Sequence, residues 1–231
     1  MPNPPFLLSD SDALIQVFMT RQRRALAELR TRGGMVTAVL PEVESEVCNH
    51  RKFRQQFEPE FQRTVKAGNL VVLERGDTRR LLLERDTPVD AVDRELLELE
   101  ARCRDYNKYV DEGEAYTHAH AARLGLPVMS HDQKAMTQLR RLGLRVGHPT
   151  LRFFDLLVFA HGRGWVTTEE CERARKYLSG QGEFIPYEFK AQGASFADCA
   201  AIFPCRLAVT APGEAPIPPG RPSDVLCLEL V

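Results

Sequence analysis

Short apolar runs alternate with longer amphipathic segments through about residue 147, and this alternation constrains the fold more than any other feature of the sequence. Five runs have the length and composition of buried strands: 6–9, 35–40, 69–74, 126–129 and 144–146. Apolar residues recur at helical spacing in the intervening or following segments 13–30, 42–53, 91–110, 114–124, 132–142, 150–160 and 168–178. Strands that alternate with helices predict a mainly parallel sheet covered on both faces, that is, an α/β/α three-layer sandwich.

The composition of the chain changes after about residue 180, where glycine and proline become frequent, most of all in 211–222. Residues 225–231 have the composition of a last strand. We therefore predict one α/β domain over residues 1–180 and a C-terminal extension over 181–231. The sequence leaves open whether this extension is a small β-rich appendage or irregular chain.

The overall charge and the cysteines indicate how the protein could attract phosphates and in which compartment it works. The formal net charge of the 231-residue chain is −1, so attraction to phosphates must come from local basic patches. Six cysteines occur without a C-x-x-C pair, which favours reduced thiols. The amino terminus lacks the pattern of a signal peptide, and no apolar stretch approaches the ~20 residues that span a bilayer. These features predict a cytoplasmic protein.

Acidic residues stand where strands end or helices begin. Asp10 closes the first predicted strand, and Asp132 follows the fourth. Glu42 and Glu46 are four residues apart, so they share one face of the helix that follows the second strand. Glu114 opens the helix that leads into the fourth strand. Ligands of open α/β sheets bind beyond the carboxyl ends of the strands, so these side chains are expected to meet there.

Carboxylates that converge from separate segments repel one another unless a cation or a proton joins them. Oxygen ligands favour a hard cation, Mg²⁺ or Mn²⁺. Such an ion lowers the pKa of a water that it binds and stabilises charge on a phosphodiester during hydrolysis. The acidic residues therefore indicate a metal-dependent hydrolase.

Four segments, 7–15, 39–47, 113–125 and 127–135, carry a resemblance to a known family. The first ends a strand with Ser-Asp-Ser-Asp, the second has proline and then a helix with glutamates, the third begins Gly-Glu-Ala, and the fourth contains Ser-His-Asp. In this order they resemble the motifs of PIN domains over roughly residues 5–180. The resemblance implies a Mg²⁺- or Mn²⁺-dependent endoribonuclease, in many members the toxin of a toxin–antitoxin pair. It implies as metal ligands and catalytic residues Asp10, Glu46, Glu114 and Asp132.

Candidate contacts to the substrate lie beside these acids and on the first helix. The hydroxyls of Ser11 and Ser130 could hold the metal ion or a phosphate, and Arg21 and Arg24 could bind RNA phosphates. The alternative for either arginine is a solvated helix face. The expected partners are single-stranded RNA, an antitoxin or another protein, and a second copy of the chain in a homodimer.

Each acidic residue also has a purely structural interpretation. Asp10 and Asp132 are typical helix N-caps, and Glu42, Glu46 and Glu114 could complement helix dipoles. Asp111 is an alternative to Glu114. At the level of function, the alternatives are a catalytically inactive PIN-like module that binds RNA or protein, and a phosphatase-like metal hydrolase on the same sheet.

Overall fold

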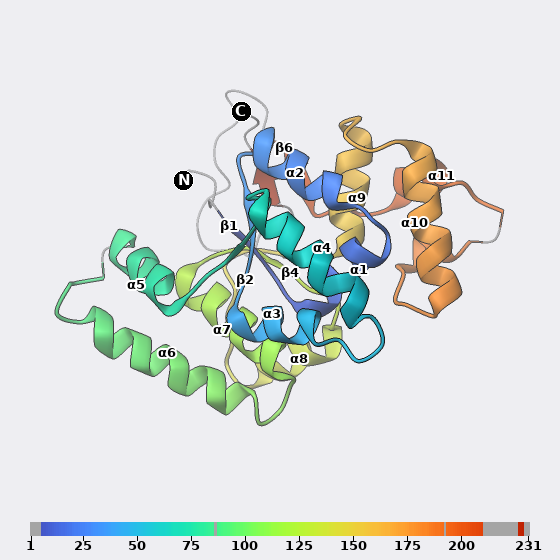
Figure 1. Cartoon of the computed structure of the whole chain (residues 1–231). Helices are drawn as coiled ribbons and strands as arrows, with labels where there is room; N and C mark the ends of the chain where they lie inside the picture. The colour runs from blue at the N-terminus through green and yellow to red at the C-terminus, as the bar shows by residue number, and fades with distance from the viewer. Residues whose placement is uncertain (1–5, 86, 192, 210–225, 229–231) are drawn as a thin grey trace.

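The core of the protein is a five-stranded, all-parallel sheet with the strand order β3-β2-β1-β4-β5 (Figure 1). The computed structural model describes residues 6–85, 87–191, 193–209 and 226–228. The strands are β1 (Phe6–Ser9), β2 (Val36–Val39), β3 (Leu70–Val72), β4 (Val128–Met129) and β5 (Thr150–Leu151). The predicted α/β class with a parallel sheet is confirmed.

Helices connect the strands and cover both faces of the sheet. They are α1 (Ser11–Met19), α2 (Arg23–Thr31), α3 (Pro41–Cys48), α4 (Arg54–Lys66), α5 (Arg75–Glu84), α6 (Val92–Tyr106), α7 (Glu112–Leu124), α8 (Gln133–Arg141), α9 (Phe153–Gly162) and α10 (Thr168–Gln181). In Figure 1, α2, α4 and α9 lie above and to the right of the strands, and α5, α6 and α7 lie on the other side.

Alternate side chains of the strands enter two different hydrophobic clusters. Leu7 and Val39 pack with α1, α2, α4 and α9, whereas the adjacent Leu8 and Ala38 pack with α5, α6 and α7. Successive side chains of a strand point to opposite faces of the sheet. Burial on both faces is typical of parallel sheets, and it explains why the strands are continuous apolar runs.

Three local predictions were wrong. Residues 144–146 are not a strand, because Leu144 is buried against α6, α7 and α8, and its N–H closes the end of α8 on the Leu139 carbonyl. The fifth strand is instead Thr150–Leu151. The predicted helix 13–30 is two helices, α1 and α2, that both contact α9, and the break contains Arg21 at φ 59°. The predicted helix 150–160 begins later than predicted, because Thr150–Leu151 form β5 and α9 starts at Phe153.

The described part of the predicted C-terminal extension packs into the main core. It contains the 3₁₀ helix η1 (Tyr187–Lys190), α11 (Phe196–Ile202) and the parallel pair β6 (Leu207–Val209) and β7 (Leu226–Leu228). Phe189 and Phe196 are buried in the same cluster as α1 and α9. The stretch 211–222 lies outside the described residues, as does most of the predicted strand 225–231 except 226–228.

Two further predictions concern cysteines and membranes. The five cysteines whose side chains are described form no disulfide with one another. Among the helices of the described residues, none combines the length and the apolar character that crossing a membrane requires.

Candidate functional site

The carboxyl ends of β1 and β4 meet at the point where the chain reverses its direction across the sheet. From β1 the chain moves to β2 and β3, and it then crosses back to β4 and β5 on the other side. The Asp10 N–H donates to the Met129 carbonyl at 3.0 Å, and the Ser130 N–H donates to the Leu151 carbonyl at 2.8 Å. Asp10 and Ser130 therefore lie side by side at the position where open α/β sheets form their ligand crevice.

Asp10 is a fully buried carboxylate with one oxygen left free. Its Oδ1 accepts a hydrogen bond of 2.9 Å from the Ala13 N–H and caps α1. Its Oδ2 is buried without a hydrogen-bond partner among the described residues. Burial raises the pKa of Asp10 to about 7; the Ser130 hydroxyl and the Ala13 N–H lower it, and the charges of Asp12 and Glu46 raise it. Ser130 Oγ is close enough to affect this pKa, yet it too is buried outside hydrogen-bonding geometry.

Glu114 is the second buried carboxylate of the crevice and comes from the first turn of α7. Only 8 % of its surface is exposed. Burial raises its pKa to about 8, and the charges of Asp132, Asp10 and Asp111 raise it further. Two acids from separate segments thus hold protons near neutral pH mainly because they are buried, and the neighbouring carboxylates add to this effect.

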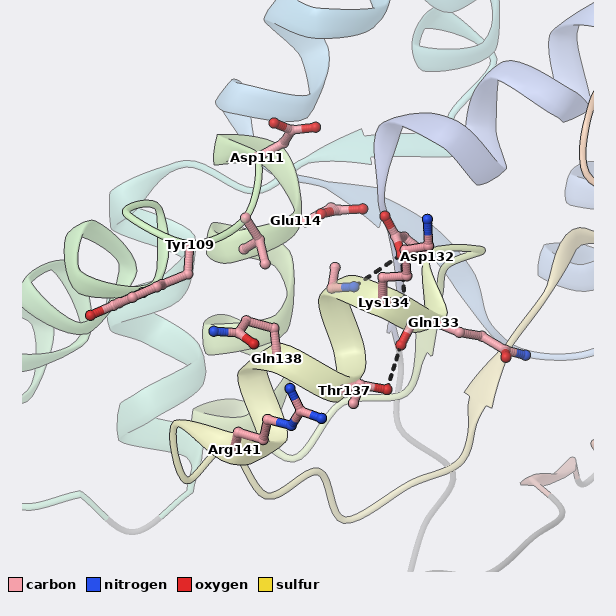
Figure 2. Close-up of a pocket in the computed structure, with 11 residues that line it drawn as sticks. Tyr109, Asp111, Glu114, Asp132, Gln133, Lys134, Thr137, Gln138 and Arg141 are labelled. Atoms are coloured by element: carbon pink, nitrogen blue, oxygen red, sulfur yellow. Dashed lines mark hydrogen bonds between the residues drawn. The ribbon is translucent and has the colours of Figure 1, made fainter.

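Asp132 lies at the mouth of the crevice and caps α8. Its Oδ1 accepts from the N–H groups of Lys134 at 2.6 Å and Ala135 at 2.9 Å. Figure 2 shows Glu114 and Asp132 facing the same space, with Asp111 at its upper rim. This space is a cavity of about 710 Å³ lined by Tyr109, Val110, Asp111, Glu114, Asp132, Gln133, Lys134, Ala135, Thr137, Gln138 and Arg141.

Glu46 reaches the same region from α3. Its Oε1 accepts a hydrogen bond of 2.9 Å from the Gly113 N–H in the first turn of α7. A Cβ at Gly113 would lie 2.5 Å from Glu46 Oε2, so only glycine allows this approach. Glu42, the alternative on the same helix, is half-buried, and its pKa is raised by burial and then by Glu112 and Glu74.

Of the four predicted acids, Glu114 and Asp132 line the cavity. Asp10 and Glu46 do not line it, but Glu46 raises the pKa of Asp10, and Asp10 raises that of Glu114. Three of the four acids also bind the amino terminus of a helix. Asp10 caps α1, Asp132 caps α8 and Glu46 holds the amino terminus of α7, in each case through one carboxylate oxygen. The positive ends of these helices offset part of the repulsion among the carboxylates. In the described residues, however, no group of three or more His, Cys, Asp or Glu side chains is close enough to hold a metal ion. The site is a carboxylate-lined crevice, not an assembled coordination shell.

The other predicted site residues divide into two groups. Ser11 and Ser130 flank Asp10, at the first position of α1 and at the end of β4. Arg21 and Arg24 lie beyond the opposite end of α1, which is about 13 Å long, and neither lines the cavity. The Arg24 Nε is 3.8 Å from Glu28 Oε1 in an exposed ion pair.

Sequence reasoning missed the contribution of the segment after α10. Partial burial raises the pKa of Asp12 most, and the negative charge of Glu183 raises it further. The Phe184 carbonyl accepts from Gln16 at 3.1 Å, and the Phe184 ring lies 6.0 Å from the buried ring of His131. No sequence signal indicated this, because these residues fall in the predicted extension.

Two buried histidines belong to the segments that carry Glu114 and Asp132. His118 and His131 have both ring nitrogens buried without partners among the described residues. Burial lowers the pKa of His118 to about 4 and that of His131 to about 3, so both rings are neutral at pH 7. Neutral rings contribute no positive charge to the crevice.

Comparison with known proteins does not assign the chain to a family. Neither a protein-family model nor a curated protein matches the sequence.

Proposed function

We propose that the protein is a PIN-like, metal-dependent ribonuclease that hydrolyses RNA phosphodiester bonds at the carboxylate crevice. The observation that carries the proposal is Asp10, a fully buried carboxylate with an unpartnered oxygen at the switch point of the sheet. An isolated buried carboxylate is costly, and it is kept where it coordinates a cation or reacts. The cytoplasmic location and a toxin-like role with an antitoxin partner belong to this proposal.

The donor chemistry of the crevice fits Mg²⁺ or Mn²⁺. Asp10, Glu114 and Asp132 offer carboxylate oxygens, and the neighbouring Ser130 hydroxyl is a further oxygen donor without a partner. Hard divalent cations such as Mg²⁺ and Mn²⁺ prefer oxygen ligands to sulfur ligands. When bound, the ion would supply an activated water and stabilise charge on the phosphodiester.

The chain's own residues have distinct roles in this proposal. Asp10 and Asp132 are anchored by helix N–H groups, so their free oxygens are held in place before a ligand arrives. Glu114, whose pKa is about 8, is able to give up or accept a proton near neutral pH as the charge of the crevice changes. Glu46 fixes the amino terminus of α7 and so positions Glu114.

The test is a cleavage assay with purified full-length protein and labelled single-stranded RNA, with single-stranded DNA in parallel. Wild-type protein with Mn²⁺ is expected to cut RNA, EDTA to abolish cutting, and Asp10→Asn to lower the rate at least about 100-fold, on the scale of losing one electrostatic catalytic group. Asp90→Asn, which removes an exposed carboxylate away from the crevice, is the matched control. Cutting that survives both EDTA and Asp10→Asn would rule out the proposal.

One observation favours a second candidate, a PIN-like module that binds RNA or a protein without cutting. The described residues contain no assembled metal group. Under this alternative, wild-type protein binds RNA with the same affinity in Mn²⁺ and in EDTA and leaves it intact. The assay above therefore separates the two candidates.

A further inference from the structure

The cavity beside the carboxylates changes character along its length. Its acidic end holds Asp132 and Glu114, and its opposite end holds Arg141 and Tyr109, as Figure 2 shows. Lys134 adjoins the acidic end, where its N–H donates to Asp132 at 2.6 Å. Because the two ends of the cavity carry opposite charges, a ligand that fills it must present different groups to them.

The floor of the cavity is one face of α8. Lys134, Gln138 and Arg141 recur at spacings of four and three residues, so they lie in line on the helix surface. Seven residues of helix separate Lys134 from Arg141, which corresponds to about 10 Å. The three side chains offer two cations and one amide along this line.

The two cations of this face are available to a ligand. Many arginines of the described chain are paired, as Arg75 is with Glu100 and Arg123 with Glu95. Lys134 and Arg141 are both exposed, and neither has a carboxylate within ion-pair distance in that part of the chain. Unpaired cations along a cavity wall favour an anionic ligand with repeated charges.

Tyr109 provides an aromatic surface at the far end of the cavity. The side chain is 57 % exposed, although its neighbour in the same turn, Tyr106, is buried. Tyr109 also borders a second hollow of about 640 Å³, where Lys108 is already paired with Asp105 at 2.7 Å. Arg102, an exposed cation on α6, also borders this second hollow, so Tyr109 lies between cations of both hollows. An exposed aromatic ring in that position suits a stacked base.

We infer that this face of α8 is the track for single-stranded RNA outside the carboxylate crevice, with backbone phosphates on Lys134 and Arg141 and a base stacked on Tyr109. The inference rests on the proposed function, because the acidic end of the cavity would repel RNA without a cation. It selects single strands, since a base must leave its duplex partner to stack on a side chain.

The test measures RNA binding separately from cleavage. Wild-type full-length protein is titrated in Mn²⁺ into fluorescein-labelled single-stranded RNA whose phosphorothioate linkages resist hydrolysis, while anisotropy is recorded. Adding Lys134→Gln with Arg141→Gln is expected to weaken binding roughly tenfold and to lower the slope of log K against log salt by about 1.4, for two lost phosphate contacts. The charge-matched control is Lys66→Gln with Arg173→Gln, two exposed cations on α4 and α10 that do not line the cavity.

Tyr109 is tested in the same background. Tyr109→Ala is expected to weaken binding about tenfold, and Tyr109→Phe, which keeps the ring, to restore it to within about twofold. Duplex RNA of the same sequence is expected to bind more weakly than the single strand and to be insensitive to Tyr109→Ala. Affinities that are equal for the track pair and the control pair, or no RNA binding by the parent protein, would overturn the inference.

The outcomes also distinguish the two proposals. If wild-type protein does not cut RNA but the track variants still weaken binding, the proposed function fails and the track stands. If wild-type protein cuts RNA and the track variants cut and bind at the parental level, the nuclease stands and the track is wrong.

Discussion

Asp10 and Asp155 are both fully buried aspartates, and their surroundings differ completely. Asp155 Oδ2 accepts from the Arg152 N–H at 2.8 Å and from the Arg152 Nε–H at 3.1 Å, and its Oδ1 accepts from the Arg206 N–H at 2.7 Å. Asp10 has one hydrogen bond, one free oxygen and no cation in ion-pair contact among the described residues. Both carboxylates are therefore buried, and they differ in whether hydrogen-bond and ion-pair partners balance their charge.

Asp155 and Asp10 therefore have different roles. Asp155 joins the start of α9 to the segment before β6, so its charge is used inside the fold. Asp10 has a buried carboxylate oxygen without a partner among the described residues, which destabilises the fold, and under the proposed function this oxygen and Glu114 bind a cation. Changing each residue in turn tests this difference.

The largest expected effect on stability is at Asp155. Asp155→Asn leaves the buried Arg152 guanidinium without its counter-charge, and we expect the free energy of unfolding in urea to fall by about 3–5 kcal/mol. Asp90→Asn at the surface is expected to change it by less than about 0.5 kcal/mol. A loss below about 1 kcal/mol for Asp155→Asn would remove the contrast with Asp10.

The opposite sign is expected at Asp10. Asp10→Asn keeps a side-chain oxygen to cap α1 and removes the buried charge, so the metal-free protein should be more stable at pH 8 by about 2 kcal/mol. The rise of its pKa from 3.8 to about 7 sets an upper limit of about 4 kcal/mol. The gain should be smaller at pH 5, where folded wild-type protein already holds the proton. Destabilisation by Asp10→Asn at pH 8 would contradict the account.

The pH dependence of wild-type protein follows from the same shifts. Asp10 and Glu114 have folded pKa values of about 7 and 8, above their ordinary values of 3.8 and 4.5. Their stabilising contribution is present below about pH 4 and is lost as the pH rises through 7 and 8. Mn²⁺ at tenfold its Kd should restore about 1.4 kcal/mol at pH 8 and much less at pH 5, measured by thermal unfolding. An equal effect of Mn²⁺ at both pH values would contradict this.

The smallest effect is expected at Gly113, where a matched control exists. Gly113→Ala forces the Glu46 carboxylate away from the first turn of α7 and should cost about 1 kcal/mol and lower the cleavage rate. Gly76→Ala occupies the same position in the first turn of α5 with open space around it, and should be neutral or stabilising by up to about 1 kcal/mol. Equal effects of the two substitutions would show that Glu46 is not held through Gly113.

The sequence predicted the sheet and the acids better than it predicted their surroundings. The apolar run 6–9 could be identified because a strand buried on both faces has no polar alternation to obscure it. Leu144 was misassigned because a short apolar run pairs equally well with helices or with a strand. The break at Arg21 carries no glycine or proline, so no local signal marked it.

The same limit applies to the crevice. Asp10 and Asp132 were predicted from their positions at strand ends, and their second role as caps was the recognised alternative. The free oxygen of Asp10 and the approach of Glu183 to Asp12 depend on packing between distant segments, which local patterns do not encode.

Under the proposed function, the buried carboxylates of Asp10 and Glu114 bind a divalent cation. Titration of Mn²⁺ into wild-type protein at pH 7 in a calorimeter, repeated in buffers of different ionisation enthalpy, tests it most directly. We expect saturable binding with release of protons from Asp10 and Glu114, lost in Asp10→Asn and kept in Asp90→Asn. Absence of saturable binding, or equal binding to Asp10→Asn, would contradict the account.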